Sequence, residues 1–401
     1  LTVLSLMQNK FKSMDLTVCP KLTSANLSNG TLESVKVAGM AEVSYFNVND
    51  NPAIKTLDLS NMPLLANLYA QQTAADVKGE LTEIDMTGNV TKLAFLYLNN
   101  NKLQKLIIPV EVATFEAMNN EISEFSVVDA TKTCKLSGNK LTIATLPTKP
   151  AGLNSATKIK NFTYAPQADL EVKDFITEAV LDLSAQLSAI GEGTEAQTTV
   201  YTFKAGETAL VEGTDYTVVE PGKFQFAGAY SDVVCEMVNE AFPKFQTVAD
   251  ATFKTTAFNV KEKVLAFSFE AATDGTTERT LSFGSSTGGV KYYVDFGDGN
   301  LVETEEIAQT TSISTVAQVK GIPSGTVKVY ADAADITSFT TSATAEFDAN
   351  RLKSIDLSQL VNLNQLTLNY TDMETLDLSS LQSLTVLSLM QNKFKSMDLT
   401  V

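Results

Sequence analysis

The feature that most constrains this chain is an internal copy: Leu1–Val18, which reads LTVLSLMQNKFKSMDLTV, recurs letter for letter as Leu384–Val401. Neighbouring stretches share only the spacing of leucines with it, since Leu363–Ser380 reads LNQLTLNYTDMETLDLSS. The two copies lie 383 positions apart in a chain of 401 residues. We therefore interpret the chain as slightly more than one period of a polymer or tandem array.

A recurring framework of apolar residues, L-x-L-x-x-N-x-L-x-x-L-x-L, runs from Leu1 to about Pro147 and returns near the end of the chain. Such a period predicts a solenoid of stacked units, because one unit alone cannot bury its apolar face. Each turn holds two strand-like pieces, so we expect a leucine-rich-repeat solenoid with parallel strands on both faces and little helix. The framework pairs are Leu4/Leu6, Ala25/Leu27, Phe46/Val48, Leu68/Ala70, Leu96/Leu98, Phe115/Ala117, Cys134/Leu136, Ala345/Phe347, Leu366/Leu368 and Leu387/Leu389.

The central part of the chain has alternating β patterns separated by Gly and Pro, which predict two antiparallel β-sandwich domains. The fold class is therefore mainly β. The expected domains are leucine-rich repeats at 1–147, a connector at 148–172, an Ig-like sandwich at 173–262, a second sandwich at 263–342, and further repeats at 343–401.

Two polar ladders accompany the repeats. The first is an Asn three places after the strand, which we expect to point inward and bond the bare backbone of the turn, since unpaired buried groups are costly. The second is an Asp on the other face, whose repulsion is relieved either by solvent and turn donors, the favoured reading, or by a cation. The Asn ladder is Asn9, Asn51, Asn101, Asn120, Asn139, Asn350 and Asn392, broken at Gly30, Thr73 and Thr371. The Asp ladder is Asp15, Asp58, Asp85, Asp356, Asp377 and Asp398.

Composition argues against several classes of function. A net charge of −17 disfavours nucleic acid, and no run approaches the ~20 apolar residues of a membrane span. The absence of His removes the usual general base and most zinc sites. Three cysteines, Cys19, Cys134 and Cys235, have unrelated spacings and predict no disulfide framework. We expect no enzyme, no catalytic residues, no cofactor and no metal.

The tetrapeptide Phe296–Gly299, FGDG, admits a calcium or acid–base interpretation through Asp295 and Asp298. A calcium loop would need further oxygens at alternate positions, which this segment lacks. Turn formation by two glycines and an Asx side chain is favoured.

Outward positions of the LxL strands hold exposed aromatics interleaved with amides, which suit a protein- or glycan-binding surface. The alternative is that the rings only pack laterally on one another. The candidate ligand face is Tyr45, Asn47, Tyr69, Phe95, Tyr97 and Glu116, with Asn67 and Asn99 beside it.

The duplicated turn predicts a partner. If residue 401 is followed by CPKLTSANL, as residue 18 is, the 21-residue spacing continues and the array runs through nine turns. The chain begins in mid-repeat, so we expect its true start to lie elsewhere and raw Leu-lined ends to be covered by copies of the chain stacked head to tail. A covalent tandem array, a non-covalent filament and an engineered permutation all remain open. The expected assembly interface is Leu4, Leu6, Phe11, Met14, Leu16, Leu387, Leu389, Phe394, Met397 and Leu399.

Two groups of motifs carry a family resemblance. The run YYVDFGDG…TVKVYADAADITSF…NRLKSIDLS resembles the PKD-like domain that leads into leucine-rich repeats in cell-surface proteins of Bacteroidota. The run LTIATLPTKP…VLDLSAQ…TVYTFKAG…LVEGTDYTVVEPGKFQF resembles the sandwich that follows those repeats. The resemblance implies export to the extracellular surface and a role in adhesion or surface assembly.

The sequence therefore supports two candidate functions. The first is a structural unit of an extracellular fibre or surface stalk, with leucine-rich arrays that continue across unit boundaries. The second is a monomeric adhesin that binds a host protein or glycan through the LxL face.

Overall fold

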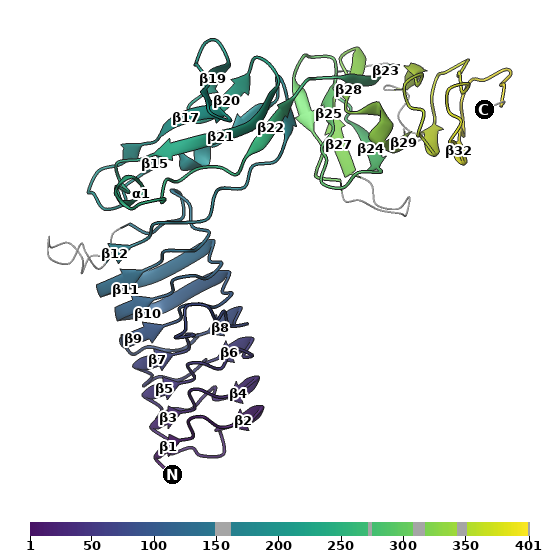
Figure 1. The fold of residues 1–401 in the computed structure, drawn as a ribbon. Helices are drawn as coiled ribbons and strands as arrows, with labels where there is room; N and C mark the ends of the chain where they lie inside the picture. Colours follow the sequence, from purple (N-terminus) through teal and green to yellow (C-terminus); the bar gives the residue numbers. More distant parts are fainter. Residues whose placement is uncertain (149–161, 272–274, 308–316, 343–350, 400–401) are drawn as a thin grey trace. The chain divides into compact units, whose positions relative to one another are not determined.

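The computed structural model describes residues 1–148, 162–271, 275–307, 317–342 and 351–399 (Figure 1). It is mainly β, with one four-residue α-helix among these residues, α1 (Lys244–Thr247), so the predicted fold class is confirmed. The chain divides into two units. The first comprises Leu1–Lys173, Leu181–Phe224 and Ser231–Phe258, and the second comprises Asp174–Val180, Gln225–Tyr230 and Asn259–Val401.

The first unit begins with the solenoid, whose LxL strands form one parallel sheet of eight strands. The framework residues stand opposite one another in register, as Leu4 does with Ala25 and Phe46 with Leu68. In order along the sheet, the strands are β1 (Val3–Ser5), β3 (Ser24–Asn26), β5 (Tyr45–Asn47), β7 (Asn67–Tyr69), β9 (Leu93–Tyr97), β10 (Lys105–Glu116), β11 (Glu124–Lys135) and β12 (Phe162–Thr163).

The opposite face of the solenoid carries short parallel pairs, β2 (Ser13–Asp15) with β4 (Ser34–Lys36) and β6 (Thr56–Asp58) with β8 (Glu83–Asp85). The prediction of two strands per turn is confirmed in these turns. It does not hold in β10 and β11, which are single strands of 12 residues each. Leu57 and Leu68 lie eleven positions apart, whereas Leu106 and Phe115 lie nine apart, so the shorter repeats have too few residues for a separate turn.

One further strand lies in the segment that the sequence assigns to a connector. Within 148–172, β12 pairs parallel with β11 and places Phe162 opposite Cys134. Tyr164, directly after β12, packs on Phe242 and Phe245 of the sandwich at ring-centroid distances of 5.2 and 5.3 Å. The solenoid therefore ends on an aromatic contact with the sandwich of the same unit.

The sandwich that follows contains the predicted alternating strands. Long β17 pairs antiparallel with β21, with Phe203 opposite Cys235, and β14, β20 and β19 form a three-stranded sheet in that order. The elements are β13 (Phe175–Ile176), β14 (Val180–Asp182), a 3-10 helix (Ser184–Gln186), β15 (Ser188–Ala189), β16 (Gln197–Thr198), β17 (Val200–Ala205), β18 (Thr208–Ala209), β19 (Tyr216–Glu220), β20 (Lys223–Phe226), β21 (Tyr230–Val238) and β22 (Phe258–Lys261).

In the second unit, the strands of the second sandwich and the second repeat segment share two five-stranded sheets, ordered β26-β25-β28-β23-β30 and β27-β24-β29-β31-β32. Their aromatic and leucine side chains form one buried cluster that includes Phe267, Phe283, Phe339, Leu366 and Leu368. The elements are β23 (Leu265–Ala271), β24 (Arg279–Ser285), β25 (Tyr293–Asp295), β26 (Leu301–Glu303), β27 (Ala317–Gly321), β28 (Thr326–Tyr330), a 3-10 helix (Ala333–Asp335), β29 (Ile336–Ser342), β30 (Leu352–Asp356), β31 (Gln365–Asn369) and β32 (Val386–Ser388).

The start of this second repeat segment differs from the expectation. Ala345 and Phe347, the expected strand pair, lie outside the described residues. The parallel neighbour of β31 is instead β29, which places Phe339 opposite Leu366. The last strand of the preceding sandwich thus serves as the first strand of the repeats, with Phe339 and the buried Thr341 opposite the LxL leucines Leu366 and Leu368.

Candidate functional site

The predicted ligand residues come together on the outward side of β5, β7, β9 and β10. Parallel register places Asn47 beside Tyr69, Tyr69 beside Tyr97, and Tyr97 beside Glu116. The four rings of Tyr45, Tyr69, Phe95 and Tyr97 form a continuous cluster, which we call the aromatic face.

Ring contacts connect all members of the aromatic face. Tyr69 lies at the centre, with its ring centroid 5.4 Å from Tyr45, 6.3 Å from Phe95 and 5.4 Å from Tyr97. Phe95 and Tyr97 are 5.9 Å apart. Lateral packing, the alternative left open by the sequence, is therefore present, but it leaves Phe95 39 % exposed.

Partial burial changes the acidity of two phenols in the aromatic face. Desolvation raises the pKa of Tyr69, with smaller contributions from Tyr45 and Tyr97. Desolvation also raises the pKa of Tyr97, and the Glu116 carboxylate adds to the effect. Both hydroxyls are consequently neutral donors at physiological pH.

Polar side chains beside the rings are anchored to backbone. Asn47 Oδ1 accepts the N–H of Asn49 at 2.9 Å, and its Nδ2 donates to the Tyr45 hydroxyl at 3.3 Å. Asn99 Oδ1 accepts the N–H of Met118 at 2.7 Å. These bonds hold the amides in fixed orientations.

A second set of polar contacts borders the aromatic face on the β10 side. Asn99 Nδ2 donates to Gln71 Oε1 at 2.7 Å and to Glu116 Oε2 at 3.1 Å, and Lys135 Nζ lies 2.7 Å from Glu116 Oε1. The sequence analysis named Glu116 but missed Gln71 and Lys135. Their outward positions in register with Asn99 and Glu116 were the available signal.

The Asn ladder has the predicted structural role. Asn120 Nδ2 donates to Leu98 O in the preceding turn and Ala117 O in its own, at 3.0 and 3.2 Å, and its Oδ1 accepts the N–H of Leu103. Asn51 and Asn139 make the same three kinds of contact. Asn350 lies outside the described residues.

The residue before most of the described ladder positions has a left-handed backbone, which the sequence analysis did not predict. Asn29, Asp50, Asn100 and Asn119 have φ between 56° and 61°, and Gly138 has φ 71°. Asn, Asp and Gly adopt this region at lowest cost. An N-N or D-N dipeptide before the apolar residues was the available signal.

The Asp ladder is relieved by turn donors, as favoured from the sequence. Asp58 Oδ1 accepts the N–H and the hydroxyl of Ser60 at 3.0 and 2.6 Å, and Asp377 accepts the N–H of Ser379 at 2.9 Å. Lys36 separates the row, with its Nζ 3.7 Å from Asp15 Oδ2. Among the described residues, no group of three or more His, Cys, Asp or Glu side chains could hold a metal ion.

The FGDG segment is also built as a turn. Asp295 Oδ1 accepts the N–H groups of Gly297 and Gly299 at 2.7 and 2.9 Å, and Asp298 accepts from Asn300. Both carboxylates are thus committed to local hydrogen bonds. Phe296 is buried, against Gly321.

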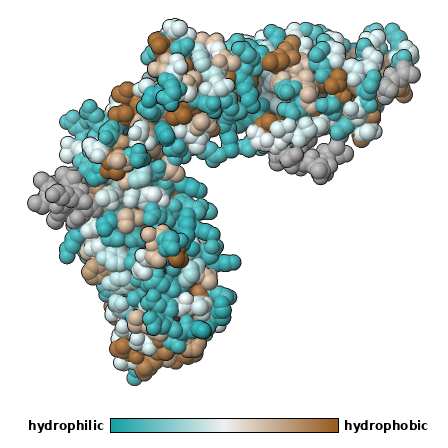
Figure 2. Space-filling model, viewed as in Figure 1, coloured by the Kyte–Doolittle hydropathy of each residue, from teal (hydrophilic) through white to brown (hydrophobic). Residues whose placement is uncertain are grey.

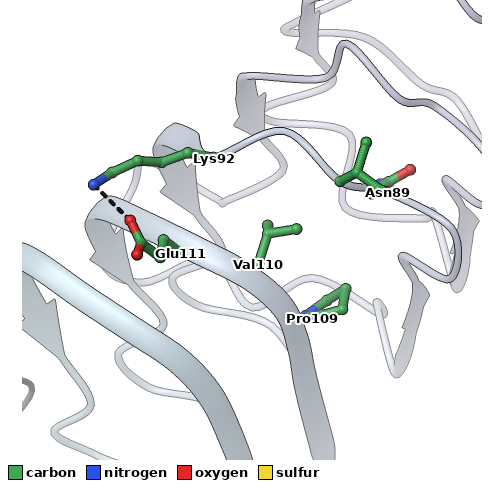
Figure 3. A pocket seen from close by; sticks show the side chains of 6 residues that line it. Asn89, Lys92, Pro109, Val110 and Glu111 are labelled. Carbon is green, nitrogen blue, oxygen red and sulfur yellow. Dashed lines mark hydrogen bonds and ion pairs between the residues drawn. The ribbon is translucent and has the colours of Figure 1, made fainter.

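An open pocket of about 370 Å³ lies between the loop before β9 and the middle of β10 (Figure 3). It is lined by Asn89, Val90, Lys92, Pro109, Val110 and Glu111. Lys92 and Glu111 pair across it at 2.9 Å, so their charges compensate each other. No helix in the described part of the chain is long and apolar enough to cross a membrane.

The duplicated turn is contacted on opposite sides in its two copies. In the first copy, Leu6 N donates to Asn26 O and Gln8 N to Ser28 O, both in the following turn. In the second copy, Thr385 N and Val386 N donate to Asn364 O in the preceding turn. The first copy is therefore bonded only on the side of the following turn, and the second copy only on the side of the preceding turn, among the described residues.

Side chains of the duplicated turn follow the same rule. Asn392 donates to Leu368 O and accepts from Thr371 N, whereas the identical Asn9 donates only to Met7 O two residues away. Leu16 is 2 % exposed and its counterpart Leu399 is 64 % exposed.

The remaining expected interface residues are divided between exposed and partly buried positions. Phe11 is exposed, whereas Leu4, Leu6 and Met14 are partly buried. In the second copy, the side chains that pack against the core of their own unit are Leu387, Leu389, Phe394 and Met397.

No protein-family model and no curated protein matches the chain. Among solved structures, the functional domain of InlJ from Listeria monocytogenes, described as including a cysteine ladder, is similar at 11 % identity and a TM-score of 0.26. The match covers 66 % of this chain and 62 % of the InlJ chain, less than two thirds of that domain's length.

Proposed function

We propose that this chain is a non-catalytic structural unit of an extracellular fibre or stalk on a bacterial surface, in which leucine-rich arrays continue from one copy to the next. The observation that carries the proposal is the duplicated turn. Its first copy is contacted from the following turn and its second copy from the preceding one. Taken together, the contacts of the two copies are those of a single turn that is hydrogen-bonded to a neighbouring turn on both sides.

Backbone geometry supports this continuation. Among the described strands, β1 pairs only with β3 and the identical β32 pairs only with β31, so each has an open edge on the side where the other is paired. A free parallel edge is a template for another strand. Leu6 N donates to Asn26 O at 2.8 Å, while Leu389 has no such bond within the described residues.

Apolar surface supports it as well. Figure 2 shows hydrophobic residues gathered at the end of the first unit where β1 lies. Exposed apolar side chains there include Leu1, Val3, Met7 and Phe11. Solenoids normally cover such an end with a polar capping repeat or a partner. Contact between opposite ends of successive copies is head to tail, and such contacts extend into filaments unless the rotation closes a ring.

A two-unit chain tests the proposal directly. Residues 19–401 would be joined after Val401, so that the second copy of the turn is followed by the segment that follows the first. We expect the backbone amides of Leu387 and Leu389 in the first copy of the chain to become strongly protected from hydrogen exchange. Exchange as fast as in the single unit would contradict a continuous array.

The non-covalent form of the proposal is tested with the single chain. Sedimentation at increasing concentration should show end-to-end oligomers, and Phe11→Glu should abolish them, because Phe11 is 44 % exposed at the expected contact. Leu64→Glu is a matched control, since Leu64 is 48 % exposed within the array. If oligomers persisted in Phe11→Glu but were lost in Leu64→Glu, the contact between chains would not lie at the end that contains Phe11, and the proposal would be contradicted.

A further inference from the structure

We infer that the aromatic face is a binding site for a neutral oligosaccharide. The inference goes beyond the proposed structural role and does not depend on it. It rests on the size of the ring cluster, the fixed hydrogen-bonding groups at its border, and its charge.

The rings supply a platform of oligosaccharide size. Tyr45, Tyr69 and Tyr97 lie on three successive strands, and strands are spaced by about 4.8 Å. The platform thus extends over roughly 10–15 Å, which is the length of two or three pyranose rings. The C–H faces of a sugar pack on aromatic rings, and rigid rings lose little conformational entropy on binding.

Hydrogen-bonding groups border the rings on both sides. Asn47 and Asn99 are held by backbone bonds to Asn49 and Met118, and Gln71 and Glu116 are held by Asn99 Nδ2. Groups with fixed orientation can select among hydroxyl positions without a further ordering cost. The buried Asn99 acts by holding Gln71 and Glu116, and a sugar offers hydroxyl groups to these two and to Asn47.

The charge of the border favours a neutral ligand. Its one carboxylate, Glu116, is paired with Lys135 at 2.7 Å. No unpaired cation stands beside the four rings among the described contacts, so a sulfated or uronic-acid chain has no counter-charge there.

Surrounding residues favour a glycan over a protein. On the flanking strands, the outward residues in register with the rings are polar: Ser24 and Asn26 on β3, and Thr114 and Glu116 on β10. A stable protein interface buries about 800 Å² on each side around an apolar core. Four rings enclosed by hydroxyl, amide and carboxylate groups provide a smaller apolar area of the kind that one sugar chain covers.

The experiment measures binding of the whole chain to a panel of neutral tetrasaccharides: cellotetraose, laminaritetraose, maltotetraose, xylotetraose, mannotetraose and tetra-N-acetylchitotetraose. The protein has no Trp and 11 Tyr, so tyrosine emission can be followed without a Trp background, and the variants below assign any change to the aromatic face. We expect saturable binding of at least one sugar, and Phe95→Ala and Tyr97→Ala should each weaken it by roughly tenfold.

Controls separate ring contact from folding. Tyr97→Phe keeps the stacking surface and should retain most of the affinity, while Leu64→Ala removes an exposed apolar side chain outside the aromatic face and should leave the sugar affinity unchanged. Thermal unfolding of each variant must match the unsubstituted chain; where Tyr97→Ala fails to fold, Phe95→Ala alone decides. Failure of every sugar to bind, binding that Phe95→Ala leaves intact, or ring-dependent binding of proteins only would each overturn the inference.

Discussion

Single buried amides join the turns of this solenoid. Asn120 connects carbonyl oxygens of two turns and caps the N–H of Leu103. Replacing it by Ala leaves these groups unpaired in a buried site, where each costs about 1–3 kcal/mol. We expect Asn120→Ala to lower the free energy of unfolding by at least ~2 kcal/mol in urea titrations.

The same residue at the edge of the array is the control for this prediction. Asn9 donates to one nearby carbonyl, Met7 O at 3.2 Å. Asn9→Ala should therefore change the stability of the single unit by less than about 0.5 kcal/mol. Equal effects of Asn9→Ala and Asn120→Ala would contradict the assigned role of the ladder.

Gly321 is required by the close approach of a ring. A Cβ on Gly321 would lie 2.3 Å from Phe296 Cδ2, in the core beside the FGDG turn. The ring must move, and overpacking of this kind costs about 1–3 kcal/mol. We expect Gly321→Ala to lower the melting temperature of the second unit. Gly228→Ala is the control, because its Cβ would meet nothing closer than 3.9 Å, and it should leave the melting temperature unchanged.

Asp side chains that accept hydrogen bonds from a Ser or Thr two residues later predict a dependence of stability on pH. Hydrogen bonds from the hydroxyls of Thr87 and Ser184 lower the pKa of Asp85, in the Asp ladder, and of Asp182, in the sandwich, below the ordinary 3.8. Because the folded pKa is lower than the unfolded one, the stabilisation is complete above 3.8 and is lost as pH falls through the folded pKa.

Urea midpoints measured from pH 6 downwards test this. We expect the urea midpoint to decrease once the pH falls below the ordinary carboxyl pKa. Asp182→Asn should reduce this decrease, because an amide oxygen accepts the same hydrogen bonds without titrating. Asp76→Asn removes another exposed carboxylate and should leave the slope unchanged. A midpoint that rises on acidification would contradict the sign.

At the scale of elements, the duplicated sequence separates local preference from context. Ser13–Asp15 forms β2 because it pairs with β4 of the following turn. The identical Ser396–Asp398 is not a strand. The same three residues are therefore a strand only when a neighbouring turn supplies the ladder, which is expected when β propensity mainly reflects packing.

Two identical leucines provide a matched prediction. Leu16 is covered by the following turn and Leu399 is not. Leu16→Ala should lower the free energy of unfolding by about 2–4 kcal/mol. In a dilute solution of the single chain, Leu399→Ala should lower it by less than ~0.5 kcal/mol. In the two-unit chain, Leu399→Ala should become as costly as Leu16→Ala. Equal costs in the dilute single unit would contradict the difference in burial.

Periodicity explains how much of the fold and the candidate site was predictable. Leucine spacing fixed the register, and register placed Tyr45, Tyr69 and Tyr97 side by side. Spacing could not predict that β29 of the sandwich would act as a repeat strand, because Ala345 and Phe347 continued the 21-residue period equally well. Contacts made by long side chains across strands, such as Lys135 with Glu116, depend on rotamers that a repeat pattern does not specify.

At the scale of the whole molecule, sequence order and structural units differ. The segments Asp174–Val180 and Gln225–Tyr230 belong to the second unit although the sequence predicts them within the first sandwich. Ala179 packs with Tyr293 and Tyr330 of the second sandwich. Each unit has its own buried core, so each can unfold as a cooperative body.

Calorimetry of the full chain should accordingly resolve two transitions. Asn120→Ala, in the first unit, should shift one transition, and Gly321→Ala, in the second, should shift the other, because each removes or strains contacts within one core only. The double variant should shift both by the sum of the single effects, since distant independent sites add within about 0.5 kcal/mol. A single transition that both substitutions move together would mean that the two units unfold as one.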